Sequence, residues 1–317
     1  MFKLMAESRK RIIITAIICL SLLIVLVGSL LLLNGKRGVK NYQSNNYGSN
    51  TEQHLGVEAA KIDEKVIANA NIDNQITSIS KPDLEFSGLS VSLPILMYHY
   101  VETPTATTTL KGLYLDPKIF AEQLMALNKN NYDLLFMSEA AASLQDEKLL
   151  GNKNIVLTFD DGYEDFYTEV FPLLKKYNYK ATLYIIINKL GAPGYLTREQ
   201  VKELASSGLV EIGSHTFNHP DLRVLKDKDA KFEITASKKI LEQISGRPVT
   251  SFAYPFGYYK TDFFALASST GYTNAVSVIP GLKQGRENIW LLRRLRPGDR
   301  SGEVFVKWLD DWSKSKY

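Results

Sequence analysis

Polar and apolar residues follow two patterns along the chain, and the longer one predicts strands alternating with helices. From residue 92 onward, short apolar runs are separated by stretches whose apolar residues recur at helical spacing. The predicted strands are Pro94–Tyr98, Ile155–Thr158, Ala181–Ile187, Val210–Gly213, Ser251–Ala253, Asn274–Val278 and Leu291–Leu295. The predicted helices are Pro117–Asn130, Glu164–Tyr177, Arg198–Ser207, Asp227–Ile244, Thr261–Ser269 and Glu303–Ser313. Such alternation indicates parallel βαβ units, and about seven of them favour an α/β barrel over an open doubly wound sheet.

The N-terminal part of the chain has a different pattern, a single long apolar run. Residues 12–33 carry no charged side chain and consist mainly of Ile, Leu and Val. About 20 apolar residues cross a bilayer as a helix, whereas the apolar region of a signal peptide is about 7–15 residues and ends at small residues. Because this run is longer and Asn34–Arg37 follows it, an uncleaved transmembrane anchor is favoured over a signal peptide. We expect a single-pass cell-membrane protein whose C-terminal domain is extracellular.

The segment after the anchor contains little that would form a core. Residues 41–54 are polar and rich in Asn and Ser, which is typical of a flexible stalk. The predicted organisation is therefore a cytoplasmic tail over residues 1–11, an anchor over 12–33, a stalk or linker over 34–91 and a catalytic domain over 92–317.

Composition and charge exclude several classes of protein. The 317 residues include one cysteine, Cys19, so an internal disulfide framework and a Cys-rich zinc site are excluded. The formal net charge is +4, but the first 33 residues hold four basic side chains and one acidic one. The remainder is nearly neutral, so no nucleic-acid partner is predicted.

Two neighbouring carboxylates follow the predicted strand at Ile155–Thr158. The motif reads TFDDGY from Thr158 to Tyr163. Successive side chains of a strand point to opposite faces, so Asp160 and Asp161 are expected to take different roles. An acidic turn that ends in glycine explains this motif equally well when it is considered alone.

Two histidines follow the predicted strand at Val210–Gly213. His215 and His219 are four residues apart, a spacing that places both imidazoles on one face of a helical turn. Two imidazoles and a carboxylate form a common zinc-type ligand set with a position left for water. Alone, the pattern is more typical of two polar loop histidines, but its occurrence together with Asp160–Asp161 favours a metal site.

Two further strand ends carry candidate chemistry. In Tyr254–Gly257, a turn fixed by proline and glycine would expose backbone N–H groups able to hold an oxyanion, although an ordinary aromatic turn is favoured on these residues alone. His99 follows the first predicted strand, where an isolated histidine is more often structural.

Together these motifs resemble the polysaccharide deacetylases of carbohydrate esterase family 4, the NodB-homology group, over residues 92–300. The resemblance implies a distorted (β/α)7-type barrel, here with an N-terminal transmembrane helix, and one divalent metal ion. Zinc is the expected metal, with cobalt, nickel, iron and manganese as alternatives. By motif position, the resemblance implies Asp161, His215 and His219 as metal ligands, Asp160 as general base and the backbone N–H of Phe256 as oxyanion donor.

The sequence departs from typical family members at two positions. Ala253 stands where they carry the arginine that orients the catalytic aspartate, and no histidine follows His219 to supply the usual late general acid. Both departures, with the early motif Tyr98–Val101, resemble the circularly permuted poly-N-acetylglucosamine deacetylases. That branch takes its general acid from the early motif, which is His99 here.

The resemblance implies a hydrolase that removes acetyl groups from N-acetylglucosamine residues of a cell-wall or cell-surface polysaccharide. Peptidoglycan, the linkage unit of a wall polysaccharide and poly-N-acetylglucosamine all fit. The substrate-binding candidates are Tyr254, Pro255, Tyr258 and Tyr259. Four aromatic residues could form a stacking platform for sugar rings, although aromatic packing around the turn fits each equally well: Tyr254, Phe256, Tyr258 and Tyr259. For the basic cluster between Arg286 and Arg300, a solvated or salt-bridged strand is favoured over contact with an anionic polymer. The competing functions are an inactive glycan-binding barrel and a metal-dependent phosphoesterase.

Overall fold

The computed structural model describes residues 88–148 and 150–314. Its strands are β1 (Ser90–Ser92), β2 (Ile95–Tyr98), β3 (Asp133–Leu135), β4 (Asn154–Phe159), β5 (Ala181–Ile185), β6 (Val210–Ser214), β7 (Ser251–Ala253), β8 (Asn274–Val276) and β9 (Lys283–Gly285). Its α-helices are α4 (Pro117–Lys129), α5 (Met137–Gln145), α6 (Phe171–Tyr177), α7 (Arg198–Ser206), α8 (Asp227–Ser245), α9 (Asp262–Thr270) and α10 (Gly302–Lys314).

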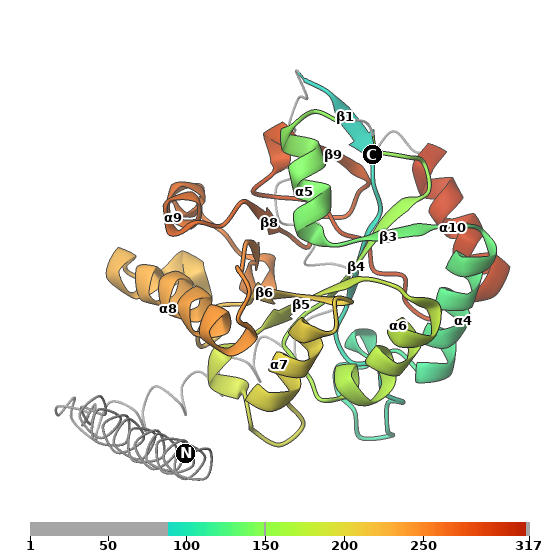
Figure 1. The fold of residues 1–317 in the computed structure, drawn as a ribbon, viewed down its shortest axis with the longest axis horizontal. Coiled ribbons are helices and arrows are strands. Elements are labelled where there is room, and N and C mark those ends of the chain that lie inside the picture. Colours follow the sequence, from blue (N-terminus) through green and yellow to red (C-terminus); the bar gives the residue numbers. More distant parts are fainter. Residues whose placement is uncertain (1–87, 149, 315–317) are drawn as a thin grey trace, which may run out of the picture. The chain divides into compact units, whose positions relative to one another are not determined.

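A parallel sheet forms the centre of the fold, as the alternating pattern predicts. Its strands follow the order β2-β4-β5-β6-β7-β8, and β3 adds to β4 as a side branch. Figure 1 shows the sheet with helices around it. A separate antiparallel pair joins β1 to β9. The short strands β1, β3 and β9 and the nine-residue helix α5 were missing from the prediction.

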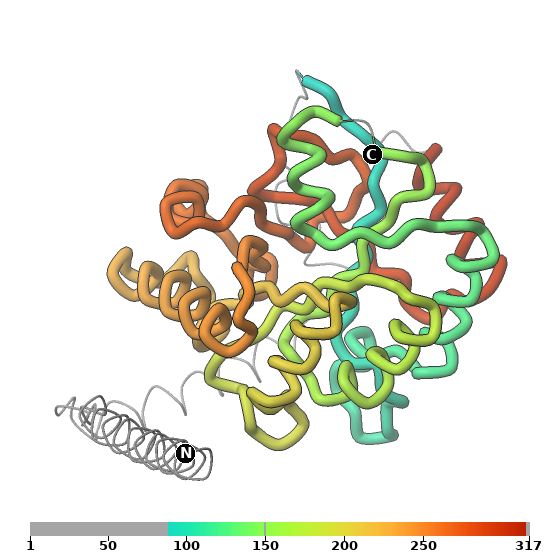
Figure 2. Tube along the Cα trace, in the orientation of Figure 1, coloured from blue at the N-terminus to red at the C-terminus, as the bar shows by residue number. Residues whose placement is uncertain are grey.

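The segment 291–295 lies between the two edges of the sheet. Leu292 forms a parallel bridge with Val276 of β8, and Leu295 forms one with Leu96 of β2. Backbone hydrogen bonds of 2.8–3.0 Å accompany both bridges. The path is visible in the trace of Figure 2, where this red segment approaches the cyan β2. The prediction of a regular strand at Leu291–Leu295 is therefore wrong, because the segment forms only a single bridge with each edge strand. The two bridges nevertheless place the segment between β8 and β2, where it completes a distorted barrel.

Apolar side chains form two packed groups, one on each face of the sheet. The larger group lies between the strands and the surrounding helices and includes the fully buried Phe120, Leu174 and Leu204. The smaller group lines the barrel interior, where the apolar face of α5 packs against residues such as Val156 and Leu292. This dense packing gives a rigid frame for side chains that follow the strands.

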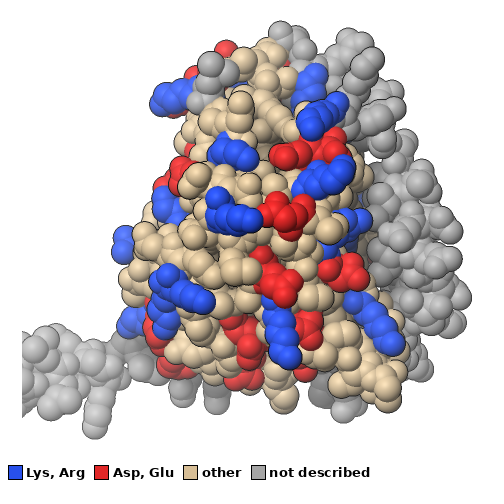
Figure 3. All heavy atoms as spheres, turned by 90° about the vertical axis from the view of Figure 1, so that its right-hand side faces the viewer, with Lys and Arg blue, Asp and Glu red and all other residues tan. Residues whose placement is uncertain are grey.

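Helix α7 begins with a capping box. Thr197 caps the start of α7 by accepting a hydrogen bond from the Gln200 N–H, and the Gln200 side chain accepts one from the Thr197 N–H, which satisfies two N–H groups that have no partner within the helix. The face drawn in Figure 3 carries Lys and Arg side chains interspersed with Asp and Glu, without a continuous area of one sign.

No helix in the described part of the chain is long and apolar enough to cross a bilayer, and the anchor predicted at residues 12–33 lies outside that part.

Candidate active site

Left-handed backbone conformations concentrate at the loops that carry the predicted site. In the described part of the chain seven non-glycine residues have positive φ, and four of these belong to the site motifs: Asp161, Thr216, His219 and Phe256, with φ values of 58–78°. Such conformations cost free energy and persist only where the surrounding structure holds them. Such a concentration is typical of functional sites.

Asp161, His215 and His219 converge on one point, as the motif pattern predicts. Nε2 of His215 lies 3.4 Å from Oδ1 of Asp161, and Nε2 of His219 lies 3.6 Å from the same oxygen. One ligand atom from each residue falls within 4.8 Å of the others. One carboxylate and two imidazoles at this separation form a suitable ligand set for a divalent metal ion.

The electrostatics of the three residues also fit a cation. Nδ1 of His215 lies 2.8 Å from the carbonyl of Ala253, which can only accept, so Nδ1 donates and Nε2 faces Asp161. Burial lowers the pKa of His215, but the Asp161 hydrogen bond and nearby carboxylates outweigh it and raise the pKa above its usual value. Positive charge is therefore favoured at this point. Burial, assisted by His215, lowers the pKa of His219 to about 4, so its lone pair is available at neutral pH.

The two histidines meet for a reason other than the predicted one. Residues 215–219 form an irregular loop after β6, not a helical turn. The loop turns back through the positive φ of Thr216 and His219, and Thr216 Oγ1 accepts a hydrogen bond from the His219 N–H at 2.9 Å. The ring centroids of His215 and His219 are thereby brought to 4.7 Å.

Asp160 and Asp161 point in different directions because of a turn that follows β4. The strand ends at Phe159, so strand alternation alone does not separate the two carboxylates. Asp161 and Gly162 both have positive φ, and this turns Asp161 toward the histidines while Asp160 stays in the barrel. Different roles for the two side chains are consistent with this geometry.

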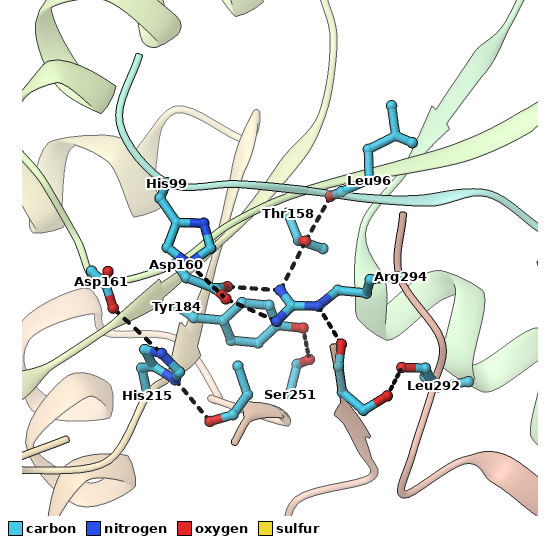
Figure 4. A network of polar contacts seen from close by, with 12 residues as sticks. Leu96, His99, Thr158, Asp160, Asp161, Tyr184, His215, Ser251, Leu292 and Arg294 are labelled. Carbon is cyan, nitrogen blue, oxygen red and sulfur yellow. Dashed lines mark hydrogen bonds and ion pairs between the residues drawn. The ribbon is translucent and has the colours of Figure 1, made fainter. Parts of the chain in front are cut away.

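Arg294 holds Asp160 inside the barrel, a contact that was not predicted. Its two terminal nitrogens donate to Oδ1 and Oδ2 of Asp160 at 2.7 and 2.8 Å, and its Nε donates to the carbonyl of Ser277 (Figure 4). Burial raises the pKa of Asp160, but Arg294 outweighs burial and the pKa falls below its usual value. Leu292 also faces the barrel interior. Because side chains two residues apart in an extended segment share a face, this spacing was a sequence signal that Arg294 points into the barrel.

His99 lies beside Asp160, where the early motif ends β2. Its Nε2 is 3.9 Å from Oδ2 of Asp160, and Figure 4 shows the imidazole above both carboxylates. Burial lowers the pKa of His99 to about 4, although the charges of Asp160 and Asp161 oppose this. The structure therefore brings all five predicted metal and proton-transfer side chains together.

The turn Tyr254–Gly257 borders the site, but its residues divide between surface and core. Phe256 is 37% exposed, and its ring meets that of His219 at 4.5 Å. Tyr254 is 1% exposed and packs edge-on against Phe252, and Pro255 is also buried, so neither offers a face to a sugar ring. Packing around the turn, the alternative to sugar stacking, is therefore what the structure shows for Tyr254, and substrate binding by either residue stays a prediction.

Tyr258 and Tyr259 are half-buried and differ in their surroundings. The Arg223 guanidinium lies 3.4 Å above the Tyr258 ring. Tyr259 packs on the core beside Phe264, with ring centroids 6.0 Å apart. Sugar binding by these two tyrosines stays a prediction, and the Tyr258 ring lies 5.7 Å from the Phe256 ring.

The basic cluster of Arg286–Arg300 does not form one surface. Arg294 is 1% exposed, Arg286 is exposed, and Arg300 donates to the Pro297 carbonyl and lies over Trp308. A salt-bridged arginine is thus confirmed at Arg294.

Comparison with known proteins relates this geometry to a family. The polysaccharide deacetylase family matches residues 148–275 by its sequence profile. A Bacillus subtilis (strain 168) protein named as the polysaccharide deacetylase YxkH is 34% identical over 220 residues, 69% of this chain and 76% of the relative. The poly-β-1,6-N-acetyl-D-glucosamine N-deacetylase of Escherichia coli K12 is 34% identical over 138 residues, which cover 39% of this chain and 20% of that protein.

A solved structure extends the similarity to three dimensions. The Streptococcus pyogenes deacetylase PplD, in complex with acetate, aligns with a TM-score of 0.64 at 30% identity, covering 69% of this chain and 98% of that one.

Proposed function

Because the chain belongs to the polysaccharide deacetylase family, we propose that it is a metal-dependent N-deacetylase acting on N-acetylglucosamine residues of a cell-wall or cell-surface polysaccharide. Family members hydrolyse the amide bond of N-acetyl groups, and this chain is such a hydrolase. One observation carries the finer proposal. The Asp160 carboxylate, 3.9 Å from the His99 imidazole, lies beside the group formed by Asp161, His215 and His219.

Asp161, His215 and His219 are the residues proposed to hold the ion. When bound, a divalent cation supplies positive charge that polarises the acetyl carbonyl and favours ionisation of water. Oxygen and imidazole ligands in this number suit zinc, with cobalt, nickel, iron and manganese as alternatives.

The other residues of the site provide proton transfer and hydrogen bonding. Asp160, oriented by Arg294, accepts a proton from the water that attacks the acetyl carbon. The backbone N–H of Phe256 donates to the oxyanion that develops on the acetyl oxygen. His99 protonates the sugar nitrogen as the C–N bond breaks, which yields acetate and a free amine. Because burial lowers the pKa of His99 to about 4, the resting imidazole is neutral at pH 7, and His99 delivers the proton that Asp160, 3.9 Å away, has taken from the water.

The substrate proposal is supported by relatives and by the N-terminal sequence. The E. coli relative is named for poly-β-1,6-N-acetyl-D-glucosamine. The apolar run 12–33 supports a single-pass membrane protein with its catalytic domain outside the cell, near such a glycan. Peptidoglycan and the linkage unit of a wall polysaccharide share the acetamido group and belong to the same proposal.

The purified full-length chain tests this proposal directly. It should release acetate from β-1,6-linked or β-1,4-linked N-acetylglucosamine oligomers or from peptidoglycan, and a chelator should stop the release. Counting free glucosamine in wall fractions of a strain lacking the gene should identify the natural glycan. A protein that binds metal and glycan without releasing acetate would be an inactive binding barrel. Release of phosphate from aryl phosphates would favour a phosphoesterase, although only one three-ligand group occurs among the described residues.

A further inference from the structure

We infer that Glu233, on helix α8, is a positioning residue for the metal ligands, because its carboxylate holds the loop between His215 and His219 in its bent conformation. The inference rests on the proposed metal-dependent function. It concerns a residue outside the motifs, 14 positions after His219 along the chain.

The Glu233 carboxylate is buried, and the loop supplies its hydrogen-bond donors. The residue is 5% exposed. Its Oε2 accepts the backbone N–H groups of Phe217 at 2.9 Å and Asn218 at 2.7 Å, and its Oε1 accepts Nδ2 of Asn218 at 2.7 Å. A carboxylate that gathers three donors from two consecutive residues fixes both their backbone and the Asn218 side chain.

The loop needs such support because its backbone conformation is unfavourable. Thr216 and His219, which flank the residues bound by Glu233, have φ values of 68° and 61°. Left-handed conformations of residues with a Cβ cost free energy, and β-branched threonine adopts them rarely. A loop released from Glu233 would therefore relax toward other conformations and carry the His219 imidazole away from Asp161.

A second element clamps the loop from its other side. The Asn188 N–H donates to the Phe217 carbonyl at 2.9 Å, and Nδ2 of Asn188 donates to Oδ1 of Asn218 at 2.7 Å. Since a carboxylate only accepts, Asn218 must turn Nδ2 toward Glu233 and Oδ1 toward Asn188. The Asn218 amide thus links α8 to the segment after β5 in one fixed orientation.

The two histidines depend on Glu233 to different degrees. His215 is held at Nδ1 by the Ala253 carbonyl and directly follows β6. His219 is held through its backbone at the far end of the loop. Loss of the Glu233 contacts should therefore weaken metal binding through His219 without abolishing it.

The test is the Zn²⁺ dissociation constant of the full-length chain, measured by competition with a chromogenic chelator. In Glu233→Gln the amide oxygen can still accept the two backbone N–H groups, but its NH₂ then faces the NH₂ of Asn218. We expect the Kd to rise about tenfold or more, as is typical when an outer partner of a metal ligand is lost. Glu242→Gln is the matched control. Glu242 lies on the same helix and also accepts a backbone N–H, that of Val249, so its Kd should stay within about twofold of wild type.

Exchange of the two groups provides the rescue. Glu233→Gln combined with Asn218→Asp places the amide on α8 and the carboxylate on the loop, so that both hydrogen bonds of residue 218 are restored. We expect this double variant to recover most of the lost affinity, whereas Asn218→Asp alone sets two carboxylates against each other and weakens binding. A Glu233→Gln protein with wild-type Kd, or a double variant no better than Glu233→Gln, would overturn the inference.

A second variant covers the case in which Glu233→Gln does not fold. Asn218 is exposed, so Asn218→Ala removes the link between Glu233 and Asn188 without disturbing the core. Its Kd should rise several-fold, and an unchanged Kd would overturn the inference. A wild-type chain that binds no Zn²⁺ would overturn the proposed metal dependence as well, which separates the two failures.

Discussion

Arg294 and Asp160 are 134 residues apart in sequence and form a bidentate ion pair inside the barrel, with nitrogen–oxygen distances of 2.7 and 2.8 Å. The third motif has Ala253 where typical family members carry an arginine, and Ala253 contributes its carbonyl to His215 instead. The segment 291–295 closes the barrel between β8 and β2 and brings the Arg294 guanidinium to the carboxylate. Arg294, in the segment 291–295, thus takes the place of the arginine that the third motif lacks.

Arg294→Lys should lower kcat about 100-fold with little change in KM, because a lysine cannot hold a carboxylate at two points and a misplaced base loses most of its effect. Steady-state rates of acetate release measure this. The zinc content should stay near that of wild type, since the hydrogen bonds of Arg294 within the described residues go to Asp160, Thr158 and Ser277 and not to the proposed metal ligands. In an Asp160→Asn background, Arg294→Lys should lower kcat hardly at all, because the two residues act as one unit. Additive losses would contradict the positioning role.

His99→Ala should lower kcat by about 10²- to 10⁴-fold, the usual contribution of a general acid. The zinc content should not change, because His99 is outside the group of Asp161, His215 and His219. His54→Ala is a matched control, since His54 belongs to the predicted stalk and should leave the rate unaffected. Full activity in His99→Ala would exclude the early motif as the source of the acid.

The motifs identified the site residues more reliably than they explained the geometry. Asp160, Asp161, His215 and His219 were predicted to meet, and they do, but His215 and His219 meet through a strained loop instead of a helical turn. The sequence shows that His215 and His219 are four residues apart, whereas the left-handed backbone conformation of Thr216 depends on contacts from distant elements. Local pattern contains no such information.

The position of Arg294 likewise could not be predicted from local sequence, because it depends on how the sheet closes. The run Leu291–Leu295 predicted a regular strand, whereas the segment meets β8 and β2 through single bridges. Its two-residue periodicity nevertheless places Leu292 and Arg294 on one face. Which of the adjacent Arg293 and Arg294 faces the barrel depends on the register of two single bridges. That register follows from the closure of the whole sheet, so the sequence predicts a solvated or salt-bridged strand without identifying Arg294 as the buried arginine.

His215→Ala should lose most of the bound zinc, because it removes one of the three proposed ligands. Thermal unfolding with and without added Zn²⁺ provides a measurement independent of activity. A ligand at 100 times its Kd stabilises the folded state by about 2.7 kcal/mol, so the wild-type Tm should rise with zinc and that of His215→Ala should not. Equal rises in both proteins would mean that zinc binds elsewhere.

Gly257→Ala should reduce kcat by distorting the turn that carries the Phe256 N–H. Gly257 has φ of 74°, and an added Cβ would lie 2.2 Å from Cγ2 of Val278, so the turn must shift. Loss of one oxyanion donor typically costs about 10²- to 10³-fold. Adding Val278→Ala removes the two nearest methyl groups but leaves the Cβ of residue 278 at 3.0 Å and the backbone strain in place, so it should restore part of the rate. Gly112→Ala, at a site with nothing within 4 Å, is the control expected to behave as wild type.

Asp165 should make the protein less stable as the pH rises from about 4 to about 7. Its Oδ2 accepts the Val101 N–H at 2.9 Å, while its Oδ1 is buried and has no hydrogen-bond partner within the described structure. Burial, aided by Glu102, raises the pKa from its ordinary 3.8 to about 7 despite the Val101 hydrogen bond. Over this range the folded state keeps a proton that the unfolded state has lost, so rising pH favours unfolding.

Asp165→Asn keeps an acceptor for Val101 and removes the titration. The Tm of this variant relative to wild type should therefore increase between pH 4 and pH 8. Asp116→Asn should show no comparable change over this range, because the Lys118 N–H and the Thr103 hydroxyl lower the pKa of this exposed carboxyl, and its contribution to stability is lost only as pH falls below about 4 through the lowered pKa. Scanning calorimetry of the three proteins at both pH values decides the matter, since a Tm difference for Asp165→Asn that does not vary with pH would mean that Asp165 is already ionised at pH 4.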